Sequence, residues 1–182
     1  MMQGNIKDSL FSPDVLKRVL IYGLLTLFLG CLQCAFFPLL DFVPCTPDLI
    51  LCMLIAIALL DNEPSAMICA VGAGFYVDAI GGAGIALSPL VYFIAVILIS
   101  LFTGKILKSL PSYLLLLLPS LLWRAAATYI CIFINGRALP PFAVFKAILL
   151  PEVICTAICA IPIYFLLKLC TKPLQTHGKF TF

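Results

Sequence analysis

The stretch from Pro64 to Gly104 contains forty-one residues and a single charged side chain, Asp78. Such a segment is typical of a membrane protein, because about 20 consecutive apolar residues are enough to cross the hydrocarbon core. An ionised carboxylate near hydrocarbon costs about 2.5–3.5 kcal/mol at the centre of a helix, so these residues usually face protein or water. Asp78 is therefore the first candidate for a functional residue.

The composition of the whole chain agrees with a membrane location. Hydrophobic residues make up 64% of the sequence and charged residues only 10%, whereas about a quarter of the residues in a soluble domain are charged. No composition break or low-complexity linker divides the chain, which predicts a single integral membrane domain over 1–182. The residues before Val19 are polar and lack a small-residue cleavage site, so the first apolar run is expected to remain as a helix.

Six apolar runs follow one another, and each is entered through a proline, which suits the first turn of a helix: Pro13, Pro47, Pro64, Pro89, Pro111 and Pro141. Three of these prolines are preceded by a hydroxyl that can cap the helix, namely Ser12, Thr46 and Ser88. The pattern predicts an all-α polytopic membrane protein, a bundle of six transmembrane helices at roughly 13–37, 47–60, 64–80, 89–104, 111–135 and 141–169. The second helix would reach only ~21 Å, short of a ~30 Å hydrocarbon core, so it must depend on its neighbours or flanks.

The basic residues predict how six helices would be oriented. Eight would lie on one side of the membrane: Lys7, Lys17, Arg18, Lys105, Lys108, Lys168, Lys172 and Lys179. Only Arg137 and Lys146 would lie on the other side. Because basic residues collect on the cytoplasmic side of membrane proteins, both termini are expected in the cytoplasm.

Small residues form a stripe along the third predicted helix. At steps of four residues, and so on one face, this helix carries Ala66, Ala70, Gly74 and Asp78, and Gly82 continues the count. Within a membrane, a face of this kind lets another helix backbone come close. Two interpretations stay open: packing against another helix of this chain, or docking of a partner's transmembrane helix with Asp78 holding its register.

Two further charges fall inside predicted helices at matching depth. Arg124 lies eleven residues before the outer end of the fifth helix, and Glu152 lies eleven residues after the outer start of the sixth. Each is therefore ~16 Å from the same surface. Since the two helices are joined by a short loop, an ion pair between Arg124 and Glu152 is predicted, either as a lock for the bundle or as part of a proton or substrate pathway.

The nine cysteines do not resemble a disulfide framework, because all except Cys45 fall within or at the ends of apolar helices. A thiol in that setting behaves as a small hydrophobic group. Cys31 and Cys34 form a C-x-x-C pattern, but no histidine or second pair accompanies it, and His177 stands alone in a polar tail. No metal site and no cofactor are predicted, and no nucleic-acid partner is expected.

Several short motifs together carry a family resemblance. Pro47-Asp48-Leu49-Ile50-Leu51, Gly74-Phe75-Tyr76-Val77-Asp78 and Gly81-Gly82-Ala83-Gly84, followed by Leu87 and Tyr92, are similar to the rod shape-determining protein MreD family of bacteria. The similarity covers about residues 47–104, and the chain length, helix number and basic ends are similar as well. The many cysteines and the short second helix depart from the pattern expected of that family.

The resemblance implies a role without catalysis. Members of the MreD family are inner-membrane subunits of the machinery that builds the lateral cell wall. They bind the single-pass protein MreC and work with the MreB filament and the wall synthases. By analogy, the helix of an MreC-like protein would lie against Ala70 and Gly74, with Asp78 near its outer edge.

Two other classes were weighed against this expectation. The membrane subunit of an energy-coupling-factor vitamin transporter is also a bundle of six helices, but the first helix here lacks the Ala-x-x-x-Ala contact of those subunits, and Gln33, Asp78 and Lys146 are a thin set of vitamin ligands. An intramembrane aspartic protease needs two carboxylates at one depth, whereas Asp78 and Glu152 would be ~10 Å apart in depth. The predicted helices also contain no histidine and no G-x-S-x-G or H-E-x-x-H motif.

Overall fold

The computed structural model describes residues 13–39, 46–60, 63–81, 87–103, 108–134 and 150–175. These residues form helices joined by a few irregular positions, and no strand occurs among them. The elements are α2 (Pro13–Cys31), the π-helical turn η1 (Leu32–Phe36), the 3₁₀ turn η2 (Phe37–Leu39), α3 (Leu49–Leu60), α4 (Glu63–Gly81), α5 (Ser88–Thr103), α6 (Leu110–Ile134) and α8 (Leu150–Gln175). The predicted all-α class is confirmed over this part of the chain.

Prolines mark the helix starts, as the sequence predicts, with one exception. Pro13 is the first residue of α2, and the prolines at 64, 89 and 111 are the second residues of their helices. The exception is α3, which begins after Pro47 at Leu49 and is capped by a residue other than Thr46. The last helix runs on to Gln175, beyond the predicted end at 169, and its predicted first part, 141–149, lies outside the described residues.

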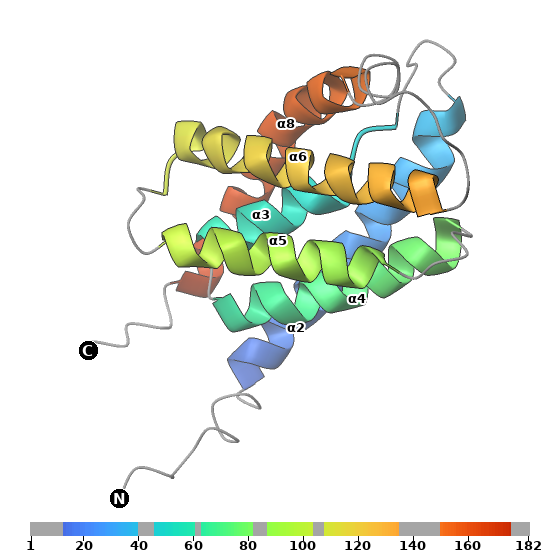
Figure 1. The fold of residues 1–182 in the computed structure, drawn as a ribbon. Helices are drawn as coiled ribbons and strands as arrows, with labels where there is room; N and C mark the ends of the chain where they lie inside the picture. Colours follow the sequence, from blue (N-terminus) through green and yellow to red (C-terminus); the bar gives the residue numbers. More distant parts are fainter. Residues whose placement is uncertain are drawn as a thin grey trace, which may run out of the picture.

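The short helix α3 forms the core of the bundle. All twelve of its residues are at most 5% exposed, and it packs against α2, α4, α5, α6 and α8 (Figure 1). Its sequence is apolar on every side, which is the pattern of a helix buried on all faces. Because this helix is enclosed by protein, its length of ~18 Å does not have to match the thickness of a bilayer.

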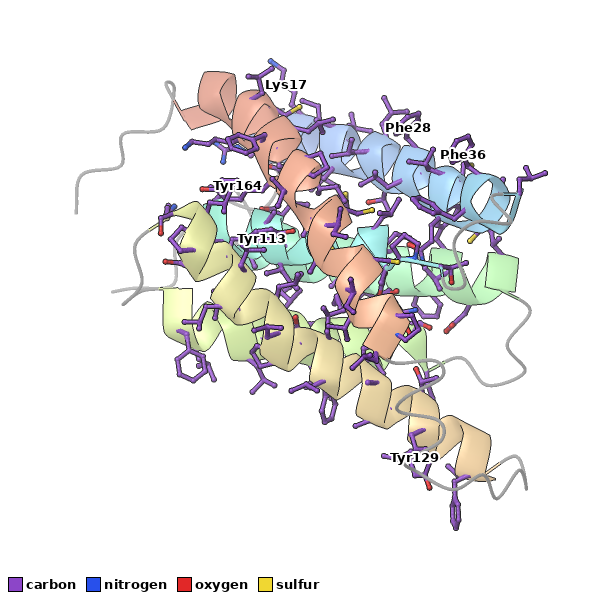
Figure 2. All side chains as sticks on the ribbon, turned by 90° about the horizontal axis from the view of Figure 1, so that it is seen from above. Lys17, Phe28, Phe36, Tyr113, Tyr129 and Tyr164 are labelled. Carbon is purple, nitrogen blue, oxygen red and sulfur yellow. The ribbon has the colours of Figure 1, made fainter. Side chains whose placement is uncertain are left out.

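The other helices turn large apolar side chains outward. Examples are Leu24 (72% exposed), Leu115 (65%) and Ile158 (64%), and Figure 2 shows Phe28 and Phe36 of the first helical segment pointing away from the bundle. An apolar exterior of this extent is expected where lipid, not water, surrounds the protein. Three segments are long and apolar enough to cross a membrane, Lys17–Phe36, Leu110–Ile130 and Leu150–Cys170, and the shorter apolar helices are Leu49–Leu60, Ser65–Ile80 and Ser88–Phe102.

Polar contacts from α6 and the residues just before it hold α3 at both its C-terminal end and its N-terminal half. The ammonium group of Lys108 donates a hydrogen bond of 3.2 Å to the carbonyl oxygen of Leu60, the last residue of α3. A cation there complements the negative end of the helix dipole. The hydroxyl of Tyr113 donates to the Cys52 carbonyl at 3.0 Å, and its ring stacks on Tyr164 of α8 with 5.2 Å between ring centroids (Figure 2). These contacts fix α3 lengthwise between α6 and α8.

Candidate functional site

The N-terminus of α3 lies inside the bundle, where its free backbone N–H groups need partners. Asp48 is the N-cap: its Oδ1 accepts a hydrogen bond of 3.0 Å from the N–H of Leu51. The side-chain oxygen of Gln33, from the π-helical turn after α2, accepts from the N–H groups of Leu49 at 3.0 Å and Ile50 at 3.4 Å. The sequence analysis proposed Thr46 as the cap, but Thr46 is exposed, and Asp48, the buried residue next to the helix, takes that role instead.

Arg124, from the middle of α6, neutralises the carboxylate of Asp48. Its guanidinium forms an ion pair with Asp48 Oδ2, and its Nε lies 3.7 Å from Oε1 of Glu152, in the first turn of α8. The Asp48 side chain is fully buried, whereas those of Arg124 and Glu152 are 23% and 22% exposed. The two carboxylates exceed the single cation by one negative charge, which lies at the positive end of the α3 dipole.

Tyr92 of α5 joins the same cluster. Its hydroxyl donates to the carboxylate of Asp48, 3.3 Å from each oxygen, and accepts a hydrogen bond from the guanidinium of Arg124. The Arg124 guanidinium also lies 5.6 Å from the centre of the Tyr92 ring, within cation–π range. The backbone N–H of Asp48 donates to the Thr156 hydroxyl of α8 at 3.1 Å. We call Asp48, Tyr92, Arg124, Glu152 and Thr156 the central polar cluster.

The predicted pair of Arg124 and Glu152 is thus present, but the sequence analysis missed its third member. Asp48 was placed at the outer end of a membrane-crossing helix and was not considered as a partner for Arg124. The length of α3 was the available signal: counted inward from Leu60, its twelve residues reach only ~18 Å. Arg124 is ~16 Å deep from the opposite surface. The two distances together roughly equal the ~30 Å thickness of the hydrocarbon core, so Asp48 is expected near the level of Arg124.

The small-residue stripe of α4 is occupied within the chain. Ala66 and Ala70 are fully buried, and Gly74 packs so closely on α5 that an added Cβ would clash with the backbone of Pro89. This geometry corresponds to the internal-packing interpretation, and a partner helix has no room on these residues. Asp78 accepts a hydrogen bond of 3.2 Å from the N–H of Ser88, the first residue of α5, so its carboxylate stabilises the start of that helix. Gly82 lies outside the described residues.

Chemically, the central polar cluster has the features of a structural lock. Each carboxylate faces the guanidinium. Two hollows occur in the described part of the bundle, one between α2 and α4 and a smaller one between α5 and α6, and no residue of the cluster lines either of them. None of the cysteines whose side chains are described forms a disulfide, and no group of three or more His, Cys, Asp or Glu in the described ranges could hold a metal ion. The cluster therefore joins α3, α5, α6 and α8 by charge and hydrogen bonding at one level of the bundle.

Comparison of the chain with protein-family models, with curated proteins and with solved structures finds no match in any of the three.

Proposed function

We propose that this chain is a non-enzymatic subunit of the bacterial cell-wall elongation machinery, of the MreD type. The observation that carries the proposal is the use made of the residues that resemble that family. Asp48 caps the buried helix and pairs with Arg124, Tyr92 bonds to Asp48, and Asp78 holds the start of α5. These residues connect helices of the bundle to one another, and such connections support a scaffold role.

In this proposal all six helices lie in the bacterial inner membrane, with α3 enclosed by the other five. The start of α2 and the end of α8 lie at the same end of the bundle (Figure 1). Apart from Arg124 in the central polar cluster, the cations whose side chains are described, Lys17, Arg18, Lys108 and Lys168, belong to the segments at that end. An end rich in cations is expected in the cytoplasm. Both termini would then be cytoplasmic, and protease added to intact spheroplasts should leave tags at either terminus uncut.

The partners in this proposal are an MreC-like single-pass protein and, in the same complex, the wall synthases and the MreB filament. Since α5 fills the stripe around Gly74, the single-pass helix would bind one of the outer apolar faces. The exposed side chains of α6 and α8, such as Leu115 and Ile158, offer apolar area of that kind. Lipid-facing helices associate through close packing, so such an interface needs no charged residue.

The experiment that tests this function uses depletion and purification together. Removing the protein from a rod-shaped host should give round cells, and the tagged wild-type chain should restore rods and retain a single-pass membrane protein in mild detergent. The alternative, a vitamin-transporter subunit, expects rod-shaped cells that no longer take up the vitamin and a purified chain that binds it. That second result would refute the scaffold.

A further inference from the structure

An apolar groove of about 490 Å³ runs between α2 and α4 on the outside of the bundle. Two glycines open it, one on each wall: an added Cβ at Gly23 or Gly72 would meet no atom within 4 Å. Its rim is formed by apolar side chains that face outward, including Leu20, Leu24 and Ile68, which are 64%, 72% and 47% exposed. The groove is therefore an open, apolar depression in the outer surface of the bundle.

The far end of the groove is closed by Tyr76. The hydroxyl of Tyr76 donates to the Leu27 carbonyl at 3.2 Å and lies 3.4 Å from the Cys31 sulfur, so the side chain bridges α4 and α2. Its ring occupies the space in front of Gly30, where a Cβ would clash with it. From Val19 to Leu27 the α2 wall measures ~12 Å along the helix axis, which is close to the ~15 Å thickness of one leaflet's hydrocarbon.

This length decides between occupants. A partner's transmembrane helix packs over both leaflets, ~30 Å in all, and would have to cross the Tyr76 bridge. One acyl chain of a phospholipid spans a single leaflet, ~15 Å, and this length matches the ~12 Å groove wall. The two glycines leave the groove walls without side chains at these positions, so that an apolar chain can lie against the backbone of α2 and α4.

The charge at the Val19 end of the groove, opposite Tyr76, indicates which lipid headgroup would bind there. Lys17 is exposed and lies half a turn before Val19, the first residue of the groove. Figure 2 places Lys17 at the same end of the bundle as Tyr113 and Tyr164. These two tyrosines are close in sequence to Lys108 and Lys168, so further cations belong to the same end. Basic residues at a membrane surface attract anionic lipid headgroups.

We propose that the groove between α2 and α4 is a binding site for an anionic phospholipid of the leaflet at the Lys17 end. One acyl chain lies along Gly23 and Gly72 and stops at Tyr76, and the phosphate lies at Lys17. The site depends on a membrane location but not on which protein is the partner, so it can fail while the scaffold function stands, and the reverse.

Native mass spectrometry of the full chain, released from nanodiscs with equal parts of phosphatidylglycerol and phosphatidylcholine, tests this site. We expect one phosphatidylglycerol retained per protein, at least tenfold more often than phosphatidylcholine. Gly23→Leu and Gly72→Leu fill the groove from opposite walls and should each lower the retained lipid at least tenfold. Ala126→Leu, at an exposed position of α6 outside the groove, is the matched control and should retain lipid as the wild type does.

The headgroup is tested separately by Lys17→Gln, which should keep one lipid bound but lose the preference for phosphatidylglycerol. A wild-type chain without that preference, or a Lys17→Gln variant that keeps it, would overturn the assignment of the phosphate. If both glycine variants retain lipid at the wild-type level, the groove is not the site that binds the lipid.

Should either glycine variant not fold, phosphatidylglycerol with a photoactivatable acyl chain keeps the proposal testable in the wild-type protein. Crosslinks must fall on α2 and α4, and crosslinks confined to α5, α6 or α8 would contradict it. If filling the groove removes a protein partner or a second copy of the chain while bound lipid is unchanged, the groove is a protein interface and the lipid site is refuted.

Discussion

Arg124 is the cation that both Asp48 and Glu152 face, and Arg124→Leu should therefore cause the largest loss of stability among the charge changes. Asp48 is fully buried, and removing one partner of a buried ion pair costs about 3–5 kcal/mol, because a lone charge remains. For a chain of this size, each kcal/mol lowers the unfolding midpoint by about 2–4 °C. Arg124→Leu should accordingly lower the midpoint by about 6–20 °C.

The two carboxylates should differ in how strongly they depend on Arg124. Glu152 is 22% exposed and 3.7 Å from the guanidinium, so Glu152→Gln should cost about 1 kcal/mol or less, as for an exposed pair. Asp48→Asn keeps an oxygen that caps α3 and accepts from Tyr92, but leaves Arg124 with only the weaker carboxylate. The stability lost by Asp48→Asn should lie between the losses of Glu152→Gln and Arg124→Leu.

Double variants separate the two partners. Arg124→Leu combined with Asp48→Asn leaves no charge at the fully buried position, and should recover at least half of the stability that Arg124→Leu loses. Arg124→Leu combined with Glu152→Gln still leaves Asp48 ionised in the core, and should recover little. Cys52 and Cys69 are buried, so a thiol-reactive fluorophore can follow their exposure as the detergent-purified protein is heated.

The reasoning fails if the two double variants behave in the opposite way. A larger recovery with Glu152→Gln would make Glu152 the principal partner of Arg124. If neither change recovers any stability, Arg124 acts through the packing of its side chain and not through its charge.

Four other substitutions test the packing and the hydrogen bonds of α3 and α4. Gly74→Leu should abolish recovery of folded protein, because the new side chain meets Pro89, whereas Gly72→Leu should elute in size-exclusion chromatography as the wild type does. Tyr113→Phe removes the hydrogen bond to Cys52 and should cost about 1 kcal/mol in thermal unfolding. Gln33→Leu leaves two buried N–H groups of α3 without an acceptor and should cost about 1–3 kcal/mol, and an unchanged midpoint would contradict the cap.

The helices could be predicted because their signals are local. Prolines at the starts and long apolar runs located α3, α4, α5 and α6 to within two residues, without any knowledge of their neighbours, whereas α8 extends six residues beyond its predicted end. The contact between Arg124 and Glu152 could also be predicted, since depth counted along two adjacent antiparallel helices depends only on the regular rise per residue.

The remaining contacts depend on the three-dimensional arrangement of the helices. The stripe around Gly74 predicts that some helix lies close, but the size of its side chains does not determine that this helix is α5. Tyr92 lies in an apolar run, which predicts a packing residue. Its hydroxyl bonds to Asp48 only because α5 passes the start of α3. Asp48 was missed because, although the shortness of its helix was recognised, the start of the helix was not expected to be the end that is buried beside Arg124.

The enclosure of α3 has a consequence for the order in which the chain folds during synthesis. The backbone N–H of Asp48 bonds to Thr156, a residue 108 positions later, and Arg124 is also made long after α3. At about 5–20 residues per second, the ribosome reaches Thr156 about 5–20 s after Asp48. During that interval α3 is too short to cross the bilayer stably. Its N-cap, Asp48, still lacks the Arg124 guanidinium at first and the Thr156 hydroxyl throughout. We therefore expect α2, α4 and α5 to pack against α3 until α6 and α8 have been synthesised. A chain truncated anywhere before Thr156 should then fail to assemble fully.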